Sequence, residues 1–342
     1  MNLKELGEFG LIKKIAEGIS FSGREVIRGI GDDTAVTQPD SDGYLLSTVD
    51  TLIEDVHFSL TYTSPSLLGR KAVTASLSDI AAMGGTPKYI LVSIAIPDNI
   101  ESEFISLLYK GIKEQAGPYG VRIIGGDTTS SPERLVISIF MLGDVPGGQA
   151  IFRDGAQEGD RIYVTGTLGD SALGLKILKE GASDIDDSPY REVILAHIDP
   201  QPRVAVGRTI AEREIATAMI DISDGLLKDL KHITEESRVG ARIEFSRLPT
   251  SDVLKRYLIE APEDKTLPLT GGEDYELLFT SPPSLSCKVE ETAKELGCPC
   301  SYIGDIVSLS KGVTVMDEDE RPIFFKYEGF DHFRDREYNQ SV

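Results

Sequence analysis

The sequence contains little positive charge for its size. Its 342 residues include 35 lysines and arginines against 56 aspartates and glutamates, which gives a formal net charge of −21. Because binding to phosphate backbones or anionic lipids depends on cationic patches, this balance argues against nucleic acid and against an anionic membrane as partners. A surplus of carboxylates is compatible with divalent cations as partners, although acidity also serves solubility.

Cysteines and long apolar runs are scarce as well. The cysteines number three, all lie near the C-terminal end and include no Cys-x-x-Cys pair: Cys287, Cys298 and Cys300. An odd number without a spacing pattern favours a reducing compartment over a disulfide framework. The N-terminus carries no apolar signal core, and no run approaches the roughly eighteen apolar residues of a membrane span. We therefore expect a cytoplasmic protein.

Three common catalytic signatures are missing. The chain has no Gly-x-x-x-x-Gly-Lys-Ser/Thr loop, no His-Arg-Asp or Asp-Phe-Gly motif, and no Gly-x-Ser-x-Gly nucleophile elbow. These absences exclude a P-loop enzyme and a protein-kinase-like enzyme, and they disfavour a nucleophilic serine.

Aspartates beside glycine, serine or threonine recur at the predicted ends of strands and helices. The first example is Gly29–Val36 (GIGDDTAV), and the others are Asp50, Asp79, Asp127, Asp221 and Asp224. Taken singly, each is equally well explained as a turn, a helix cap or half of a salt bridge. Adjacent carboxylates repel each other unless a cation lies between them. Taken together, they predict one metal-holding cluster, whose oxygen ligands suit Mg²⁺ or Mn²⁺ rather than zinc or copper.

Periodicity and turn signals predict alternating helices and strands in two domains, 1–146 and 147–342. In the first, we expect helices over 3–19, 67–83 and 101–116, and strands over 44–50, 52–60, 89–96, 121–125 and 135–142. The boundary lies at Val145–Gln149 (VPGGQ). In the second, we expect strands at 161–165, 219–221 and 275–280 and a hairpin turn at Asp317–Glu320. The glycine turn at Gly166–Ser171 leads into a helix, a pattern that generic anion sites share with many other βα turns.

A cluster with this many carboxylates has room for several magnesium ions. Holding several such ions is unfavourable unless the substrates are polyanions. The reaction that most needs such ions is phosphoryl transfer, in which metals bridge phosphates and neutralise developing charge. The metal-holding cluster therefore favours an enzyme of this class.

Six motifs, in order, closely resemble the thiamine-monophosphate kinase family of the aminoimidazole-ribonucleotide-synthetase-like superfamily. They are GIGDDTAV (29–36), SLSDIAAMG (76–84), GGDTT (125–129), DISDGL (221–226), GGEDYEL (271–277) and GFDHF (329–333). The resemblance implies an α/β (α+β) fold of two domains, in which the N-terminal sheet pairs in a homodimer and a C-terminal α/β domain folds over it. It also implies transfer of the γ-phosphoryl group of ATP to thiamine monophosphate, which gives thiamine diphosphate.

The resemblance also assigns roles to individual residues. Those implied as catalytic are Asp33, Asp79, Asp127 and Asp221. Those implied as magnesium ligands are Asp33, Thr48, Asp50, Asp79, Asp127, Asp221 and Asp224. Contacts to ATP are implied for Tyr119, Gly126, Asp127, Arg153 and Ser223, and contacts to thiamine monophosphate for His57, Glu273 and Phe330.

Two positions depart from the family pattern. Val49 stands where threonine or serine often precedes the aspartate, so a metal contact there must use the backbone. Phe330 stands where an aromatic hydroxyl is common, so stacking is retained and a hydrogen bond is lost. Because the acceptor phosphate has a second pKa of about 6, it is already largely ionised and needs no general base. We expect direct in-line transfer.

Other members of the superfamily are alternatives. Selenophosphate synthetase usually needs a reactive cysteine near its N-terminus, and none precedes Cys287. The carbamoyl-dehydrating hydrogenase maturation factor relies on a C-terminal cysteine, and this chain ends in Asn339–Val342 (NQSV). The motifs around His57 and Glu273 do not resemble those of the purine enzyme. Outside enzymes, the alternatives are a divalent-cation-binding or regulatory protein with the same fold, and for GFDHF a C-terminal segment packed in the core.

Overall fold

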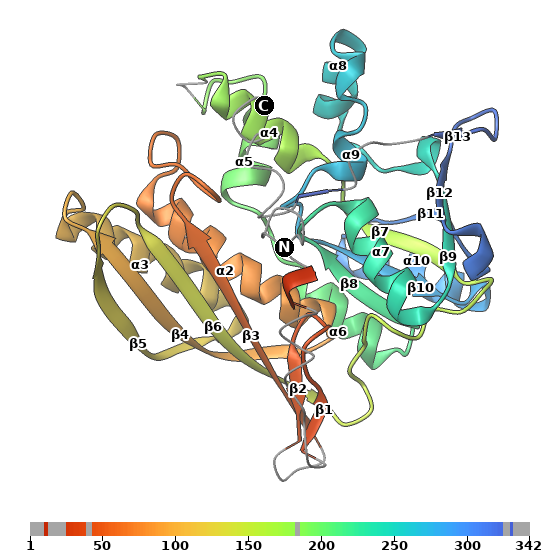
Figure 1. Cartoon of the computed structure of the whole chain (residues 1–342), viewed down its shortest axis with the longest axis horizontal. Coiled ribbons are helices and arrows are strands. Elements are labelled where there is room, and N and C mark those ends of the chain that lie inside the picture. Colours follow the sequence, from red (N-terminus) through yellow and green to blue (C-terminus); the bar gives the residue numbers. More distant parts are fainter. Residues whose placement is uncertain (1–9, 13–24, 39–42, 182–184, 324–328, 331–342) are drawn as a thin grey trace.

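The N-terminal half of the chain is built on a mixed six-stranded sheet. The structure is a computed structural model, and it describes residues 10–12, 25–38, 43–181, 185–323 and 329–330. The strand order is β1-β2-β3-β6-β4-β5. The strands are β1 (Val26–Arg28), β2 (Ala35–Thr37), β3 (Gly43–Ile53), β4 (Thr86–Pro97), β5 (Arg122–Ser131) and β6 (Val136–Pro146). Helices α2 (Pro65–Ala82) and α3 (Ser102–Ala116) cover one face of this sheet, and the other face is turned outward (Figure 1).

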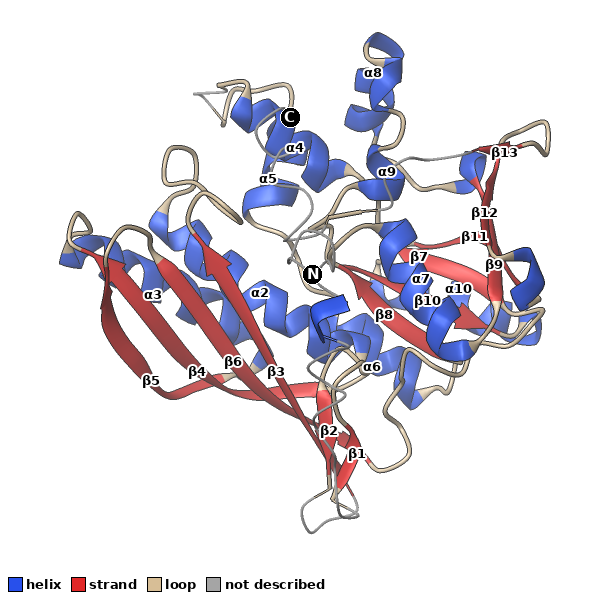
Figure 2. Cartoon of the chain, in the orientation of Figure 1, coloured by secondary structure: helices blue, strands red, loops and turns tan. Residues whose placement is uncertain are grey.

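The C-terminal half carries a second, seven-stranded sheet with the order β13-β12-β9-β11-β7-β10-β8. Its strands are β7 (Arg161–Thr165), β8 (Ala218–Ile222), β9 (Gly240–Glu244), β10 (Glu276–Ser281), β11 (Cys300–Val307), β12 (Val313–Met316) and β13 (Pro322–Ile323). Its helices are α4 (Asp170–Lys179), α5 (Arg191–Ile198), α6 (Val204–Glu212), α7 (Leu226–Ser237), α8 (Asp252–Glu260), α9 (Leu267–Thr270) and α10 (Ser286–Leu296). Figure 2 shows the two sheets side by side, with helices on each.

Helix α2 lies between the two halves and confirms the expected helix. Ser64 caps its N-terminus by accepting a hydrogen bond from the Leu67 N–H, and Pro65 occupies the first turn. The helix ends before Gly84, whose φ of +69° is in the left-handed region that favours glycine. Close packing of α2 depends on small residues, because a Cβ at Gly69 would lie 2.1 Å from the Leu108 carbonyl oxygen.

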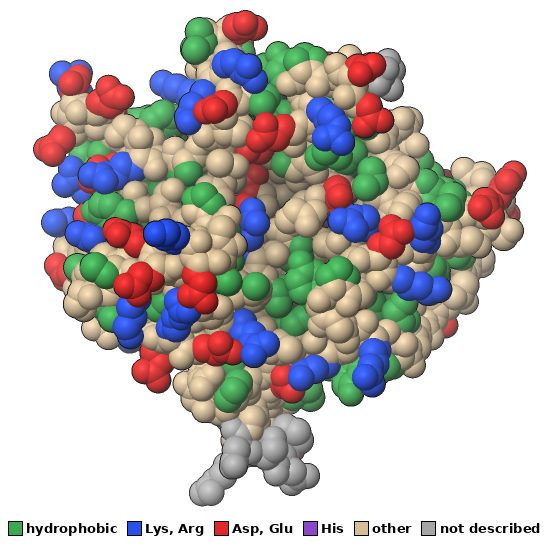
Figure 3. Space-filling view, turned by 180° about the vertical axis from the view of Figure 1, so that it is seen from behind, with side chains coloured by type: hydrophobic (Ala, Val, Ile, Leu, Met, Phe, Trp, Pro, Cys, Tyr) green, Lys and Arg blue, Asp and Glu red, His purple; other side chains and the backbone are tan. Residues whose placement is uncertain are grey.

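The two halves share one hydrophobic core. Buried side chains of the first sheet and α2, such as Ile80 and Ile139, belong to the same cluster as Met219, Leu277 and Phe279 of the second sheet. A second cluster lies within the C-terminal half, and a third joins α4, α5 and α8. The domain limit at residue 146 remains a prediction. In the part of the chain that is described, no helix is long and apolar enough to cross a membrane. Figure 3 shows charged side chains of both signs dispersed over the far side of the molecule.

Three details of the predicted secondary structure need correction or fall outside the description. The strands expected at 44–50 and 52–60 are one strand, β3, followed by a turn closed by a bridge between Glu54 and Phe58. Asp50 therefore lies inside a strand. Its carboxylate accepts a hydrogen bond from Ser76 of α2, so it is satisfied without a turn. Strand β5 likewise continues through the GGDTT motif, beyond the end expected at Gly125. Of the helix expected at 3–19, only residues 10–12 are described, and they are helical.

Candidate active site

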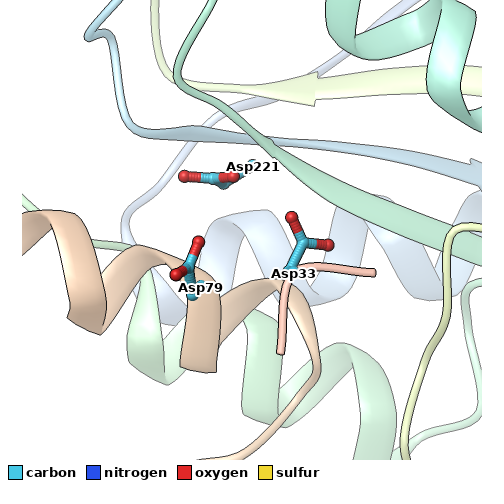
Figure 4. Close-up of side chains that lie close together, drawn as sticks. All are labelled: Asp33, Asp79 and Asp221. Carbon is cyan, nitrogen blue, oxygen red and sulfur yellow. The ribbon is translucent and has the colours of Figure 1, made fainter. Parts of the chain in front are cut away.

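Three aspartates from distant parts of the sequence meet between the two halves. Asp33 precedes β2, Asp79 lies in the last turns of α2, and Asp221 belongs to β8. One oxygen of each lies within 4.8 Å of the others, and Figure 4 shows the carboxylates facing one another. Asp33 and Asp221 are buried, and Asp79 is partly buried. We refer to Asp33, Asp79 and Asp221 as the acidic cluster, whose convergence the aspartate pattern predicted.

Neighbouring hydroxyl groups hold these carboxylates in place. Thr48 Oγ1 donates to Asp79, and Ser78 Oγ donates to Asp221 Oδ2 over 2.7 Å. Ser76 Oγ donates over 2.6 Å to Asp50, which lies on the helix-facing side of β3. A hydroxyl orients a carboxylate without neutralising it, which is the role that supporting residues play around metal ligands.

The acidic cluster carries more negative charge than its surroundings balance. Burial raises the pKa of Asp79 well above its ordinary value, and the charges of Asp50, Asp221 and Asp33 raise it further. Burial likewise raises the pKa of Asp221 to about 8, and the charge of Asp33 adds to this effect. Arg153 balances part of the charge, since its Nη2 lies 2.8 Å from Asp33 Oδ1. The remaining repulsion is relieved only by protons or by added cations.

The residues present fit a divalent cation. Asp33 Oδ2 is buried, and the described chain offers it no hydrogen-bond partner. Such an orphaned carboxylate oxygen is rare in a folded interior. The cluster presents oxygen ligands alone, the donor set that Mg²⁺ prefers.

Both aspartates of the Gly-Asp-Asp motif lie beside Arg153, and they differ in their other contacts. Asp33 points into the acidic cluster, whereas Asp32 lies 3.4 Å from Arg28 and 4.0 Å from Arg153. Burial, together with the charge of Asp33, raises the pKa of Asp32 to about 7, and Arg153 opposes this rise. Asp32 therefore fixes the arginines beside the cluster, while Asp33 remains available as a ligand.

The backbone that carries Arg153 is held by one serine of α7. Ser237 Oγ accepts hydrogen bonds from the Gly155 and Ala156 N–H groups, each over 3.1 Å, and donates to the Arg153 carbonyl over 3.2 Å. The contact between Arg153 and Asp33 thus depends on an anchor in the C-terminal half.

The N-termini of two helices are occupied by the chain's own carboxylates. Asp229 accepts from the Asp224 and Gly225 N–H groups at the start of α7, so neither Asp221 nor Asp224 is needed as its cap. Asp224 instead forms an ion pair with Lys228 at 2.7 Å. At α4, Asp274 accepts from Gly169 and Ser171, so the anion at the Gly166–Ser171 turn is one of the chain's own carboxylates.

A cavity of about 890 Å³ adjoins the acidic cluster. His57, Glu273 and Phe330, which lie far apart in the sequence, all line it. Asp50, Ser223 and Asp224 line it as well. Since Asp50 is among the charges that raise the pKa of Asp79, its presence in the wall connects the cavity to the cluster. The GFDHF segment therefore contributes Phe330 to the cavity, and Phe333 lies outside the described residues.

Three predicted site residues belong neither to the acidic cluster and its neighbours nor to the cavity wall. Asp127 and Gly126 lie in β5, which pairs with β4 at the edge of the sheet. Asp127 is in register with Ser93, and its side chain falls on the outward face because side chains alternate along a strand. Tyr119 packs against the N-terminal core, with Arg203 and Arg70 as its charged neighbours. Within one chain, Asp127 therefore does not join the acidic cluster to which it was expected to belong.

Lys71 and His197 form part of the cavity region and were missed by the sequence reasoning. The Lys71 side chain is 1% exposed, and its Nζ lies 2.9 Å from Glu273 Oε1. His197 lines the cavity, and its Nδ1 lies 3.4 Å from Glu273 Oε2. One signal in the sequence could have pointed to Lys71. It is a lysine on a helix that is otherwise rich in small and apolar residues, and it lies next to Ala72, which with Ala75 leaves room beside Asp79.

Comparison with known proteins agrees with this geometry. The family model described as AIR synthase related protein, N-terminal domain, matches residues 31–145. The family model of the corresponding C-terminal domain matches residues 157–317. Thiamine-monophosphate kinase of Escherichia coli (strain K12) is 37% identical over 329 residues, covering 96% of this chain and 98% of the relative. The Bacillus subtilis (strain 168) enzyme is 37% identical over 332 residues, covering 96% and 100%.

Solved structures show the same likeness. A structure described as AaThiL complexed with AMPPCP and TMP superposes with a TM-score of 0.83 at 35% identity, covering 97% of this chain and 99% of the other. Thiamine-monophosphate kinase from Stenotrophomonas maltophilia K279a gives 0.75 at 35% identity, covering 89% and 94%.

Two sheets packed through one helix, with carboxylates gathered at their junction, define a two-domain protein of the AIR synthase related class. Within that class, 37% sequence identity over 96% of this chain shows the family. The chain belongs to the thiamine-monophosphate kinase family.

Proposed function

We propose that this protein transfers the γ-phosphoryl group of ATP to thiamine monophosphate and so forms thiamine diphosphate. The observation that carries the proposal is an acidic cluster beside a cavity that His57, Glu273 and Phe330 line, with Asp50 in the cavity wall as the link between them. A relative crystallised with AMPPCP and TMP, at 35% identity over nearly the whole chain, supports the same pair of substrates.

The reaction brings two anions together, so charge is its main obstacle. Magnesium held by Asp33, Asp79 and Asp221, with Asp50, Thr48 and Asp224 around them, would neutralise the phosphate oxygens. The protein's own task is to place the acceptor phosphate beside the cluster and to exclude water. No general base is needed, because the acceptor oxygen is largely ionised above a pH of about 6.

The residues around the cavity divide this task. Arg153, fixed between Asp32 and Asp33, offers a forked cation for a phosphate group of ATP. Ser223 lies in the cavity wall, and we assign it a contact to the nucleotide. In the same wall, Phe330 offers a ring for stacking, and Glu273 and His57 offer polar atoms for the substituents of thiamine monophosphate. Val49 contributes only its backbone. The assignments of Gly126 and Tyr119 to ATP remain predictions.

The transfer is direct and passes through no phosphoenzyme. With ATP that is chiral at the γ-phosphorus, we expect inversion of configuration in the thiamine diphosphate formed. Retention would show two displacements and would contradict this mechanism.

The test of the activity is an incubation with ATP, Mg²⁺ and thiamine monophosphate, followed by chromatography. We expect thiamine diphosphate to form in proportion to the ADP released, and chelation of magnesium to stop both. A protein that is stabilised by magnesium but makes no thiamine diphosphate would be a binding protein with this fold, and the proposal would fail.

We also infer that the protein is a homodimer whose N-terminal sheets pack on each other. Among the described residues, no helix covers the outward face of this sheet, where Val49 is 60% exposed and Tyr89 is 41% exposed. The edge strand β5 carries one charged residue, Asp127, between Gly125 and Ser131. Monomeric proteins rarely leave such an edge and face unprotected. Sedimentation equilibrium should give twice the mass of the chain, and a monomer at micromolar concentration would contradict the inference.

A homodimer gives Asp127 a role. Because its side chain lies on the outward face, it would serve the partner's site rather than its own. Mixing Asp79→Asn and Asp127→Asn proteins under exchange conditions should then restore activity, since one site of the mixed dimer keeps both aspartates. If the mixture stays as inactive as each variant alone, Asp127 does not act across the interface.

A further inference from the structure

One buried ammonium group contacts both polar residues of the cavity wall that are assigned to thiamine monophosphate. Lys71 Nζ lies 2.9 Å from Glu273 Oε1 and donates to the His57 carbonyl oxygen over 3.5 Å. It also lies 3.4 Å from His197 Nε2. With 1% of its side chain exposed, Lys71 reaches these groups from behind the cavity wall and has no surface of its own to offer a ligand.

The orientation of His197 follows from this contact. An ammonium can only donate a hydrogen bond, so Nε2 must accept and the ring proton lies on Nδ1. Nδ1 lies 3.1 Å from Ser171 Oγ and 3.4 Å from Glu273 Oε2. Burial, with the charge of Lys71, lowers the pKa of His197 to about 3, so the ring is neutral at physiological pH. The Glu273 carboxylate is therefore paired with Lys71 through Oε1, and the Nδ1–H of His197, which is hydrogen-bonded to Ser171 Oγ, lies beside Oε2.

The backbone of Glu273 shows how closely this carboxylate is fixed. Its φ is +62°, in the left-handed region that costs a residue with a side chain about 1 kcal/mol or more. The Glu273 N–H donates to the Ser223 carbonyl over 2.8 Å, and the Tyr275 N–H donates to Ile222 over 2.9 Å. Such a conformation persists only where the neighbours determine it. A buried lysine is also unfavourable unless a carboxylate pairs with it. The contact between Lys71 and Glu273 therefore stabilises both the buried ammonium and the conformation of Glu273.

We propose that Lys71 is a positioning residue that holds the Glu273 carboxylate and the His57 main chain as a rigid anchoring wall for the amino-substituted ring of the substrate. The proposal rests on the proposed function, because it concerns the same cavity. Lys71 and Asp79 lie on one helix, eight residues and therefore about 12 Å apart along its axis. Helix α2 thus sets the spacing between the wall that anchors one end of the substrate and the cluster that receives its phosphate.

The test is a comparison of Lys71→Met with Thr74→Val in the full-length protein. Thr74 is as buried as Lys71 on the same helix, and its hydroxyl bonds Pro200 and Gln115 without touching the cavity. We expect Lys71→Met to raise the KM for thiamine monophosphate about tenfold or more while the KM for ATP changes less than about twofold. Thr74→Val should lower the melting temperature and leave both KM values unchanged.

A double variant shows whether Lys71 acts through Glu273. In a Glu273→Gln background, Lys71→Met should change the KM for thiamine monophosphate by less than about threefold, because the group it positions is already altered. Full multiplication of the two effects would overturn the proposal, and so would equal rises in both KM values. Should Lys71→Met fail to fold, Lys71→Gln, which keeps a hydrogen-bond donor, gives the same comparison. Formation of thiamine diphosphate by the unmodified protein tests the proposed function separately.

Discussion

The acidic cluster and the anchoring wall of the neighbouring cavity solve opposite electrostatic problems. At the acidic cluster, Asp33, Asp79 and Asp221 face one another, and Asp33 Oδ2 has no partner among the described residues. At the anchoring wall, every charge meets its counterpart, as in the 2.9 Å contact between Lys71 and Glu273. The acidic cluster is incomplete without added cations, whereas the anchoring wall is preformed. A protein that binds metal and phosphate at one site and an organic ring at the next needs this asymmetry.

The largest effect should come from removing a carboxylate of the acidic cluster. Asp79→Asn keeps the side-chain volume but loses a charged ligand, so we expect kcat to fall by about a hundredfold or more. Since repulsion and burial already disfavour the charged form of Asp79, the metal-free variant should melt no lower than the unmodified protein. Steady-state kinetics and thermal melts measure the two effects, and near-normal turnover would contradict the metal assignment.

A change at the anchoring wall should act on one substrate alone. Glu273→Gln keeps the shape but removes the charge that faces Lys71 and His197, so the KM for thiamine monophosphate should rise about tenfold. The KM for ATP should remain within about twofold, because the Glu273 carboxylate contacts Lys71 and His197, neither of which is assigned to ATP. Initial rates over a grid of both substrates provide the measurement. An equal change in both constants would mean that the two sites are not separate.

The stabilisation by magnesium should depend on pH. Because the pKa of Asp221 is raised from its ordinary value to about 8, the metal-free fold loses stability as the pH rises toward 8 and these carboxyls ionise. Magnesium prefers the ionised form of the carboxyls. The rise in melting temperature on adding about 10 mM Mg²⁺ should therefore grow from about pH 5.5 to about pH 8. Melting curves across this range test the sign. A shift that is independent of pH would indicate binding elsewhere.

The smallest effect is expected from the anchor of Arg153. Ser237→Ala removes three hydrogen bonds that hold the 153–156 backbone, each with a net value of about 1 kcal/mol. We expect a few-fold rise in the KM for ATP with little change for thiamine monophosphate. Titration of both substrates measures it, and Ser106→Ala, in α3 of the N-terminal half, whose exposed hydroxyl donates to the Ser102 carbonyl, serves as a matched control.

Much of this arrangement could be predicted from local sequence signals. The Ser64–Pro65 start and the Gly84 end of α2 follow from chemistry that acts within a few residues. The convergence of Asp33, Asp79 and Asp221 followed from the shared setting of aspartates beside small residues, together with the family motifs. These signals are carried by the chain itself and need no knowledge of distant partners.

The errors arose where partners lie far away in the chain. The break expected in β3 after Asp50 was wrong because Ser76 of α2 satisfies that carboxylate inside a strand. The glycine turn at Gly166–Ser171 left open whether an anion binds there, and the anion is the carboxylate of Asp274, a hundred residues on. Lys71 went unnoticed for the same reason, since its burial depends on pairing with Glu273.

The account depends most on metal ions lying among the three carboxylates. Crystals soaked in MnCl₂ with a non-hydrolysable ATP analogue, measured near the manganese absorption edge, test this directly. We predict an anomalous peak about 2.2 Å from carboxylate oxygens of Asp33, Asp79 and Asp221. Ordered nucleotide in the cavity with no anomalous density between these three residues would contradict the account.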